Sequence, residues 1–285
     1  MKRVKQNLTP FKWPGSKYRL LLWLYQHFPN HDCFVDVFGG SGAVLLHKTP
    51  SNIEVFNDLD SGLINFFLVI QKPETLKRFI EKVQWTLYSR ELYMRYSETW
   101  KEQEDPVEKA YQWWCVARMN FRGTWRDGEK TWQTSPTRQI KTSDITKEFF
   151  VKIHERFKKV CIENRPFEEI LQIYDHPETL FYLDPPYPKD KRKDKRMMYE
   201  NESTEDLHTG LVDLLLNIKG MAVLSGYKTE VYVPLLEAGW RLETKHHKSM
   251  LSVPITRGKP SNNNDRTECL YISPKAQERI QGILF

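Results

Sequence analysis

The sequence predicts an α/β protein built on a Rossmann-like parallel sheet. Short apolar runs typical of buried strands are each followed by a turn and then by a helical pattern. The first unit comprises the run 33–38, the glycine turn 39–42 and a helix start at 43–46. A second run, 53–56, leads into a helical pattern that begins near Ser61. Strand, turn, helix, strand, helix is the opening of a parallel sheet.

The alternation then stops, because residues 73–157 are mostly helical in pattern and rich in Trp, Tyr, Lys and Arg. Strand-like runs resume after this segment, and a C-terminal β-hairpin with a polar loop follows them. These later runs are 160–162, 180–183, 221–225, 240–247 and 268–273. We therefore expect one α/β domain, residues 1–72 and 158–285, interrupted by an inserted helical domain at 73–157.

Composition limits the class of protein. The chain of 285 residues is 40% hydrophobic, which is enough for a substantial core, and its formal net charge is +6. A basic excess of this size is compatible with a nucleic-acid partner. Cys33, Cys115, Cys161 and Cys269 lie far apart, as expected for reduced thiols in a cytoplasmic protein rather than a zinc site. No apolar run approaches the roughly 18–20 residues that span a membrane, and the basic N-terminus lacks the apolar stretch of a secretion signal. We expect no membrane and no metal.

The glycine turn after the first strand indicates a nucleotide-like ligand. Glycines at Gly40 and Gly42 let the backbone approach a ligand closely at the start of a helix. Asp58, at the end of the next strand, can accept hydrogen bonds from both ribose hydroxyls. A nicotinamide cofactor is disfavoured, because Leu45 stands where the G-x-G-x-x-G pattern needs its third glycine.

The tetrapeptide Asp184-Pro185-Pro186-Tyr187 follows the run 180–183 and so lies at a carboxyl end of the sheet. An aromatic amino group is a poor nucleophile, because its lone pair is delocalised into the ring. The Asp184 carboxylate and the Pro185 carbonyl could accept both N–H bonds and free that lone pair. Tyr187 offers a face on which a flipped base could stack. The motif predicts methyl transfer from a sulfonium cofactor.

The motif order resembles that of the Dam-like (alpha-group) DNA adenine-N6 methyltransferases. Residues 12–17 and 38–42 resemble the family's two cofactor motifs, Asp58 its ribose-binding acid and the tetrapeptide its catalytic motif. The resemblance implies S-adenosylmethionine as cofactor and a helical target-recognition insertion. It also implies a set of cofactor-binding residues: Trp13, Lys17, Phe38, Gly40, Gly42, Asp58, Phe167 and Asp184.

One position departs from the family pattern. Asn164-Arg165-Pro166-Phe167 falls where the family often has Gly-Asp-Phe in contact with the adenine of the cofactor. Pro166 replaces the acid, so the hydrogen bond of that acid is not expected, whereas the Phe167 ring can still pack against the adenine.

Three segments are candidates for contacts with double-stranded DNA. Asn120, Arg122 and Arg126 lie in an aromatic and basic stretch that resembles the family's target-recognition segment. The run 189–196 adds six basic residues against two acidic ones beside the tetrapeptide, and its Lys191, Arg192 and Lys193 are expected to contact phosphates. The hairpin loop supplies two further candidates, Arg257 and Arg266.

These observations predict site-specific methylation of the N6 amino group of adenine in double-stranded DNA, with the base flipped out. The N4 amino group of cytosine is an alternative, because the same acceptors serve either amine. A DNA-binding relative without activity is disfavoured by the presence of both Asp58 and Asp184. The oligomeric state, a monomer or a weak dimer, stays open. So does the setting, which could be restriction-modification, host regulation or phage self-protection.

Overall fold

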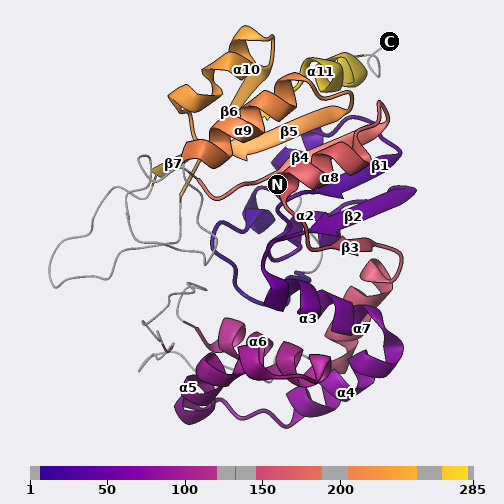
Figure 1. Cartoon of the computed structure of the whole chain (residues 1–285), viewed down its shortest axis with the longest axis vertical. Coiled ribbons are helices and arrows are strands. Elements are labelled where there is room, and N and C mark those ends of the chain that lie inside the picture. The colour runs from indigo at the N-terminus through magenta and orange to yellow at the C-terminus, as the bar shows by residue number, and fades with distance from the viewer. Residues whose placement is uncertain (1–6, 121–131, 133–145, 188–204, 249–264, 282–285) are drawn as a thin grey trace, which may run out of the picture.

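The computed structural model describes residues 7–120, 132, 146–187, 205–248 and 265–281. Within these ranges the strands form one seven-stranded sheet in the order β3-β2-β1-β4-β5-β7-β6, shown in Figure 1. The strands are β1 (Cys33–Asp36), β2 (Ile53–Asn57), β3 (Cys161–Glu163), β4 (Thr179–Leu183), β5 (Met221–Gly226), β6 (Arg241–Lys248) and β7 (Asp265–Ile272). This is the Rossmann-like α/β sheet predicted from the sequence, with the C-terminal hairpin at one edge.

Strand register brings three loops together. β1 pairs in parallel with β2 on one side and with β4 on the other, so that Asp36 lies opposite both Phe56 and Tyr182. β4 pairs in parallel with β5, whereas β7 runs antiparallel to both β5 and β6. The carboxyl ends of β1, β2 and β4 therefore meet at one edge of the sheet.

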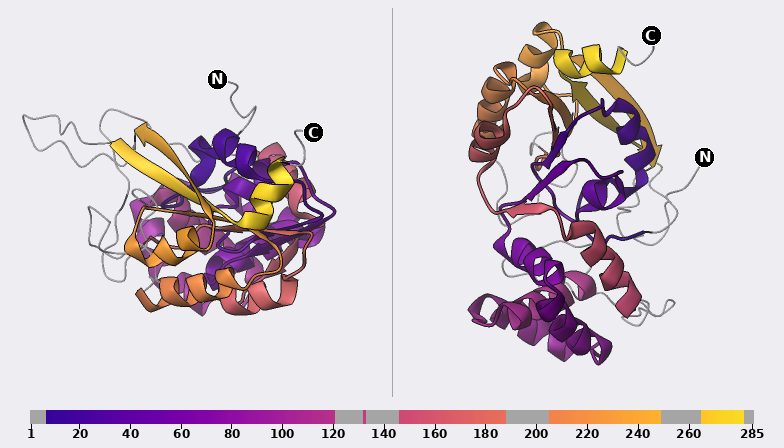
Figure 2. Two further views of the ribbon diagram at one scale, coloured as in Figure 1. Left: turned by 90° about the horizontal axis from the view of Figure 1, so that it is seen from above. Right: turned by 90° about the vertical axis from the view of Figure 1, so that its right-hand side faces the viewer.

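Alternation along the central strands divides the core into two layers. In β4, Leu180 and Tyr182 pack into one buried cluster, whereas Phe181 and Leu183 pack into another. The first layer includes α1 (Leu21–Leu24) and α2 (Ala43–His47). The second is covered by α8 (Phe167–Tyr174), α9 (Glu205–Leu216) and α10 (Val233–Glu237), on the opposite side of the sheet in Figure 2. Burial of both faces explains the continuous apolar runs that predict these strands.

The sequence after Pro14-Gly15 predicts a single helix from about Lys17 to Phe28, ended by Pro29, and this prediction is wrong. The chain instead forms the 3-10 turn η1 (Lys17–Arg19), then α1, then the 3-10 turn η2 (Tyr25–His27). At the first end, Lys17 is buried and its ammonium group reaches Asp184. At the second end, Phe28 is extended ahead of Pro29, as residues before proline usually are.

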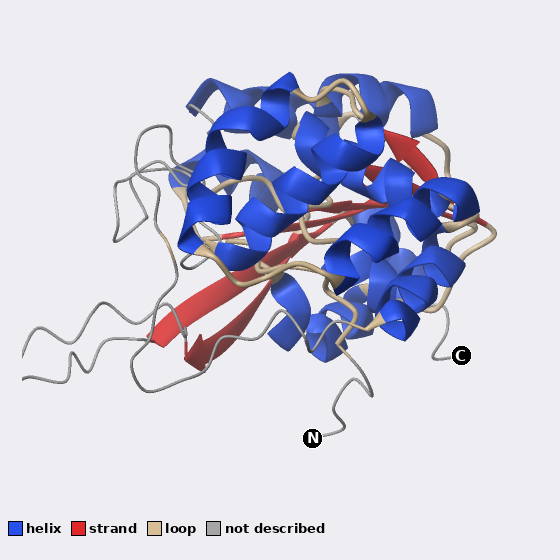
Figure 3. Cartoon of the chain, turned by 90° about the horizontal axis from the view of Figure 1, so that it is seen from below, coloured by secondary structure: helices blue, strands red, loops and turns tan. Residues whose placement is uncertain are grey.

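The helical part predicted at 73–157 packs beside α3 (Ser61–Gln71), and Figure 3 shows its helices from below. It contains α4 (Pro73–Gln84), α5 (Arg90–Thr99), α6 (Pro106–Met119), α7 (Lys147–Phe157) and the short 3-10 turn η3 (Trp100–Glu102). Three of these helices begin with a side-chain cap: Ser89 accepts from the Leu92 N–H, Asp105 from the Val107 N–H just before Pro106, and Thr146 from the Phe149 N–H.

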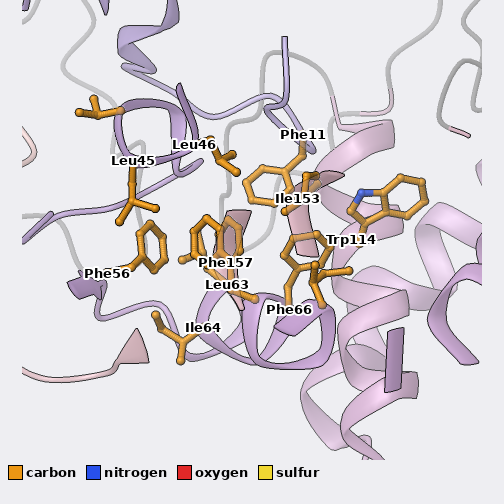
Figure 4. Close-up of a cluster of buried hydrophobic side chains, with 14 of the residues drawn as sticks. Phe11, Leu45, Leu46, Phe56, Leu63, Ile64, Phe66, Trp114, Ile153 and Phe157 are labelled. Atoms are coloured by element: carbon orange, nitrogen blue, oxygen red, sulfur yellow. The ribbon is translucent and has the colours of Figure 1, made fainter. Parts of the chain in front are cut away.

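Aromatic packing joins the helical part to the sheet. Phe66 of α3 lies 5.6 Å from Phe79 and 5.9 Å from Trp113, ring centre to ring centre. Phe157 of α7 stacks on Phe67 at 4.5 Å and contacts Phe56 of β2 at 5.3 Å; Figure 4 shows this cluster. One buried cluster therefore includes residues of both predicted domains, and their boundaries stay a prediction.

Gly62 allows α3 and α6 to approach closely, which leads to a stability prediction. A Cβ atom there would lie 2.3 Å from Cδ1 of Trp113 and 2.8 Å from Trp100. Gly62→Ala is therefore expected to lower the free energy of unfolding by about 1–3 kcal/mol through overpacking. Gly210→Ala on α9 is the matched control, because nothing lies within 4 Å of the added atom, and we expect it to be neutral or stabilising by up to about 1 kcal/mol. Urea denaturation measures both, and equal stability of the Gly62→Ala and Gly210→Ala proteins would contradict the packing argument.

The described part of the chain contains no helix that is both long and apolar enough to cross a membrane. Within the same residues, no group of three or more His, Cys, Asp or Glu side chains is arranged to hold a metal ion. All four cysteines are free thiols.

Candidate active site

A cleft opens at the carboxyl ends of β1 and β4. β1 has β2 on one side and β4 on the other, so the loops that leave β1 and β4 diverge there, and ligands of open α/β sheets bind at such a switch point. The cleft, its open mouth included, encloses about 1020 Å³. Its lining includes Trp13, Lys17, Asp36, Phe38, Gly40, Asp58, Phe167 and Asp184. Seven of these eight residues were predicted as cofactor-binding residues from the sequence; the exception is Asp36.

The glycine turn brings Trp13 and Asp58 together. Gly40 and Gly42 have φ angles of +49° and +69°, which residues with a Cβ rarely adopt. A Cβ on Gly40 would lie 2.7 Å from Nε1 of Trp13, and the Gly40 N–H donates to Oδ2 of Asp58 at 2.9 Å. The turn therefore leaves no room for a side chain at Gly40, and the approach of its backbone to a ligand stays a prediction.

Backbone amides hold the Asp58 carboxylate in place. Besides the Gly40 N–H, the Asp60 N–H donates to Oδ1 at 2.9 Å. Burial raises the pKa of Asp58, although these hydrogen bonds act in the opposite direction. A carboxylate has about four acceptor positions, so Asp58 keeps acceptor capacity toward the cleft.

Asn57, which the sequence analysis did not single out, ties the strand ends to the Phe167 segment. Its Nδ2 donates to the carbonyls of Val37 and Arg165, and its Oδ1 accepts from the Arg165 N–H. Phe167, buried at the start of α8, lies 5.8 Å from Phe38 between ring centres. Although Pro166 replaces the acid of the family pattern, Phe38 and Phe167 still line the cleft with aromatic rings.

Lys17 and Asp184 form an ion pair in the cleft. The Lys17 ammonium lies 2.7 Å and 2.8 Å from the two carboxylate oxygens of Asp184, although 167 residues separate them in the chain. Burial alone would lower the pKa of Lys17, but the charges of Asp184 and Glu268 raise it above its ordinary value. Burial raises the pKa of Asp184 to about 6, against the opposing charge of Lys17. Asp184 is therefore mostly ionised at neutral pH, and its side chain is 18% exposed.

Side chains from distant elements fix the rest of the tetrapeptide. His208 of α9 is fully buried, and its Nε2 lies 3.0 Å from the Pro186 carbonyl. A carbonyl only accepts, so Nε2 carries a proton and donates to it, and Nδ1 lies 2.8 Å from the Tyr232 hydroxyl. The Tyr187 hydroxyl donates to Glu268, and its ring packs edge-on against Tyr227 at 4.4 Å.

Asp36 is a functional candidate that the sequence analysis missed. It is 1% exposed and lines the cleft, and its Oδ2 has no hydrogen-bond partner among the described residues; the same holds for the nearby Tyr182 hydroxyl. Burial raises the pKa of Asp36 well above its usual range, and the negative charges of Asp184 and Asp58 raise it further. Buried polar atoms without partners are rare, and Asp36 and Tyr182 both line the cleft, which makes them candidates for contact with a ligand. An acid inside the apolar run 33–38 was the signal that could have identified it.

Few of the predicted DNA-binding residues lie in the described part of the chain. Asn120 is buried, and its Nδ2 donates to the Tyr93 hydroxyl at 3.0 Å, a contact that stabilises the helical part. Arg266 pairs with His247 in the β6–β7 ladder. Six predicted residues lie outside the described residues: Arg122, Arg126, Lys191, Arg192, Lys193 and, in the hairpin loop, Arg257. The DNA contacts therefore stay predictions.

A Rossmann-like sheet with an antiparallel hairpin at its edge, and Asp-Pro-Pro-Tyr at the switch point beside a glycine turn, is the arrangement that the resemblance to DNA adenine methyltransferases implies. The family model of the D12 class N6 adenine-specific DNA methyltransferases matches residues 13–249. The chain belongs to this family, as the resemblance of its motifs predicts.

Several curated relatives are similar to the chain, each described as a DNA adenine methylase. The protein of Escherichia coli K12 is 27% identical over 43% of this chain and 45% of its own length. Those of Salmonella typhi and Vibrio cholerae are 23% and 24% identical, each over 65% of this chain and 66% of their own length. The chain thus spans less than two thirds of these relatives.

Among solved structures, the chain is similar to the rRNA methyltransferase aviRa from Streptomyces viridochromogenes. The match covers 96% of this chain and 93% of aviRa, with 12% identity and a TM-score of 0.39. A likeness of this size adds nothing to the assignment.

Proposed function

We propose that the chain transfers a methyl group from S-adenosylmethionine to the N6 amino group of adenine at a specific site in double-stranded DNA, with the target base flipped out of the helix. The observation that carries this proposal is the Lys17–Asp184 pair, which keeps the acid of the tetrapeptide ionised at the switch-point cleft. Membership of the D12 family supports adenine as the target.

The lining of the cleft fits S-adenosylmethionine. Asp58 offers acceptor capacity for the ribose hydroxyls and Phe167 an apolar surface for the adenine. Oδ2 of Asp36, which has no partner among the described residues, is the proposed acceptor for the amino group of the methionine part. The narrow turn at Gly40 lets the backbone approach that part closely. When bound, the cofactor supplies a methyl group on a positively charged sulfur.

The contribution of Asp184 is at the amino group that receives the methyl. An ionised Asp184 accepts one N6–H hydrogen bond while Lys17 occupies other lone pairs of the same carboxylate. The Pro185 carbonyl is the proposed acceptor of the second N–H, and it draws the nitrogen lone pair out of conjugation. N6 must also lose a proton as it gains the methyl group, and a carboxylate with a pKa of about 6 can take it.

Tyr187 is the proposed platform for the flipped base. Stacking of a base on an aromatic side chain is worth about 1–3 kcal/mol, which offsets part of the cost of unstacking. The contacts with Tyr227 and Glu268 hold this ring in one orientation before DNA binds. Preorganisation of this kind lowers the entropy lost on binding.

The pKa of Asp184 predicts the acidic limb of the pH profile. The ionised carboxylate is the stronger acceptor, and only this form can take the proton that N6 loses, so activity requires the deprotonated form, which predominates above about pH 6. We expect kcat/KM to fall about tenfold per pH unit below that value. Initial rates between about pH 5 and pH 9 measure it, and a flat profile down to about pH 5 would contradict the assigned role. The ionisable groups that influence Asp184 are Lys17, Asp36, Tyr182, Tyr187 and Glu268.

The basic run 189–196 is proposed to bind DNA phosphates. Neutralising Lys191, Arg192 and Lys193 together is expected to weaken binding to all DNA sequences alike and to flatten the dependence of log Kd on log salt by about two to three units. Fluorescence anisotropy with two unrelated duplexes over a salt series measures both effects. Weakening confined to a single recognition sequence would instead mean that these residues read bases.

A transfer assay tests the proposed function directly. Purified protein is incubated with methyl-labelled S-adenosylmethionine and unmethylated duplex DNA, and the label in DNA is counted. Binding of the cofactor, followed by calorimetry, with no transfer to any DNA would favour an inactive DNA-binding relative. Transfer to cytosine only would favour the N4-cytosine alternative.

A further inference from the structure

Glu268 is a buried acid behind the tetrapeptide that lies outside the predicted motifs and has no proposed contact with the base or the cofactor. It lies on β7, is 4% exposed and stands opposite Lys245 in the β6–β7 ladder. An isolated buried carboxylate is costly unless it is paired and hydrogen-bonded. Its partners therefore indicate why it is there.

Groups from three distant parts of the chain converge on one oxygen of Glu268. Ser225 of β5 donates to Oε1 at 2.7 Å, and the Tyr187 hydroxyl donates to the same atom. The Lys17 ammonium lies 3.5 Å from it. These contacts join the N-terminal segment, the loop after β4 and two strands of the sheet at one buried point.

Through these contacts Glu268 acts on both functional parts of the tetrapeptide. Lys17 lies between two acids, because the same ammonium contacts both oxygens of Asp184. It is also 4.9 Å from the centre of the Tyr187 ring. The position of the Lys17 charge and the orientation of the ring thus depend on one carboxylate.

We propose that Glu268 is a positioning residue for the target base: it orients the Tyr187 ring through its hydroxyl and holds Lys17 beside Asp184. This inference rests on the proposed function, since it assumes that a base is placed against Tyr187 and Asp184. It adds the element that sets their geometry before DNA arrives.

The charge of Glu268 provides a signature that a purely structural role lacks. Glu268 is a like charge near Asp184 and raises the pKa of that acid, in addition to the effect of burial. Glu268→Gln keeps an oxygen that accepts from Tyr187 and Ser225 but removes the charge. Lys17 keeps its contact with Asp184 in this variant, so the acidic limb of kcat/KM is expected to move to lower pH by roughly one unit. The neutral amide holds the Tyr187 hydroxyl less firmly than the carboxylate, which lowers kcat/KM at neutral pH by about tenfold.

Two further variants separate geometry from charge. Tyr187→Phe keeps the ring but removes the hydroxyl, so we expect a lower kcat/KM with no shift of the acidic limb to lower pH. Glu243→Gln makes the same chemical change on β6, where Glu243 is 37% exposed and pairs with Arg241, and it should behave like wild type. Circular dichroism and the active fraction from titration with cofactor correct for any loss of folded protein.

The outcomes are distinct. The proposal is supported if Glu268→Gln shifts the acidic limb down while Tyr187→Phe and Glu243→Gln do not. If the wild-type protein is active, two results for Glu268→Gln overturn the inference but not the proposed function. One is a rate and an acidic limb equal to those of wild type, and the other is a rate that falls only in proportion to the folded fraction. A wild-type protein that transfers no methyl group to adenine overturns both.

Discussion

Asp184→Ala is expected to lower methyl transfer by about a thousandfold or more while the protein stays folded. The variant removes the acceptor that frees the lone pair of N6, and that interaction is needed in the transition state. The fold should survive, because Lys17 keeps Glu268 as a partner and the Asp184 side chain, although mostly buried, is 18% exposed. Single-turnover rates with labelled cofactor measure the loss.

Asp213→Ala is the matched control for this substitution, because Asp213 is an exposed acid on α9. It should retain the wild-type rate. Asp184→Asn tests the charge, since the amide keeps an acceptor oxygen but is never ionised. A well-folded Asp184→Ala protein that turns over at near the wild-type rate would reject the mechanism.

Lys17→Met is expected to have the second largest effect, on stability as well as on activity. It leaves Asp184 and Glu268 buried without their shared cation, and breaking such a buried pair costs about 3–5 kcal/mol. Lys17 lowers the pKa of Asp184, so its loss should move the acidic limb above about pH 6. At neutral pH we then expect activity to fall by about a hundredfold, because Asp184 is partly protonated and is no longer held in place by Lys17.

Denaturant unfolding and pH–rate profiles measure the two parts of the Lys17 prediction. Adding Glu268→Gln to Lys17→Met removes one unpaired charge and should restore part of the lost stability. Lys77→Met, an exposed lysine on α4, is the control for the loss of a lysine. A Lys17→Met protein whose acidic limb stays in place would show that the ion pair does not control the ionisation of Asp184.

The sheet could be predicted from the sequence because each central strand is a short apolar run between turn residues. The runs before Gly39, Asn57 and Asp184 all correspond to strands. The segment 17–28 could not be predicted, because its local pattern is helical while the contact of Lys17 with Asp184 depends on a residue far along the chain.

The residues proposed to bind the cofactor could be predicted, because they belong to local sequence motifs. The residues that hold those motifs in place could not. Asp36, Ser225 and Glu268 are single polar residues within or beside apolar strands, and one sequence gives no reason to connect them. Their meeting depends on the register of β7 against β5, in which Ser225 lies opposite Leu270. A polar residue that interrupts a buried strand is the signal that could have been used.

The helical segment 73–157 was predicted as a separate insertion from its change of periodicity. Periodicity does not show where the apolar face of each helix packs. Trp113 and Phe79 pack on Phe66 of α3, so the same aromatic cluster stabilises the sheet edge and the helices.

Analysis of modified nucleosides tests the central claim most directly. The chain is expressed in a host without DNA methylation, beside the Asp184→Ala variant, and the DNA is digested to nucleosides and analysed by mass spectrometry. We expect N6-methyldeoxyadenosine with the wild-type chain and none with the variant, and sequencing that reports modified bases then gives the recognition site. N4-methyldeoxycytidine alone, or no modified base from a folded wild-type protein that binds the cofactor, would contradict adenine methylation.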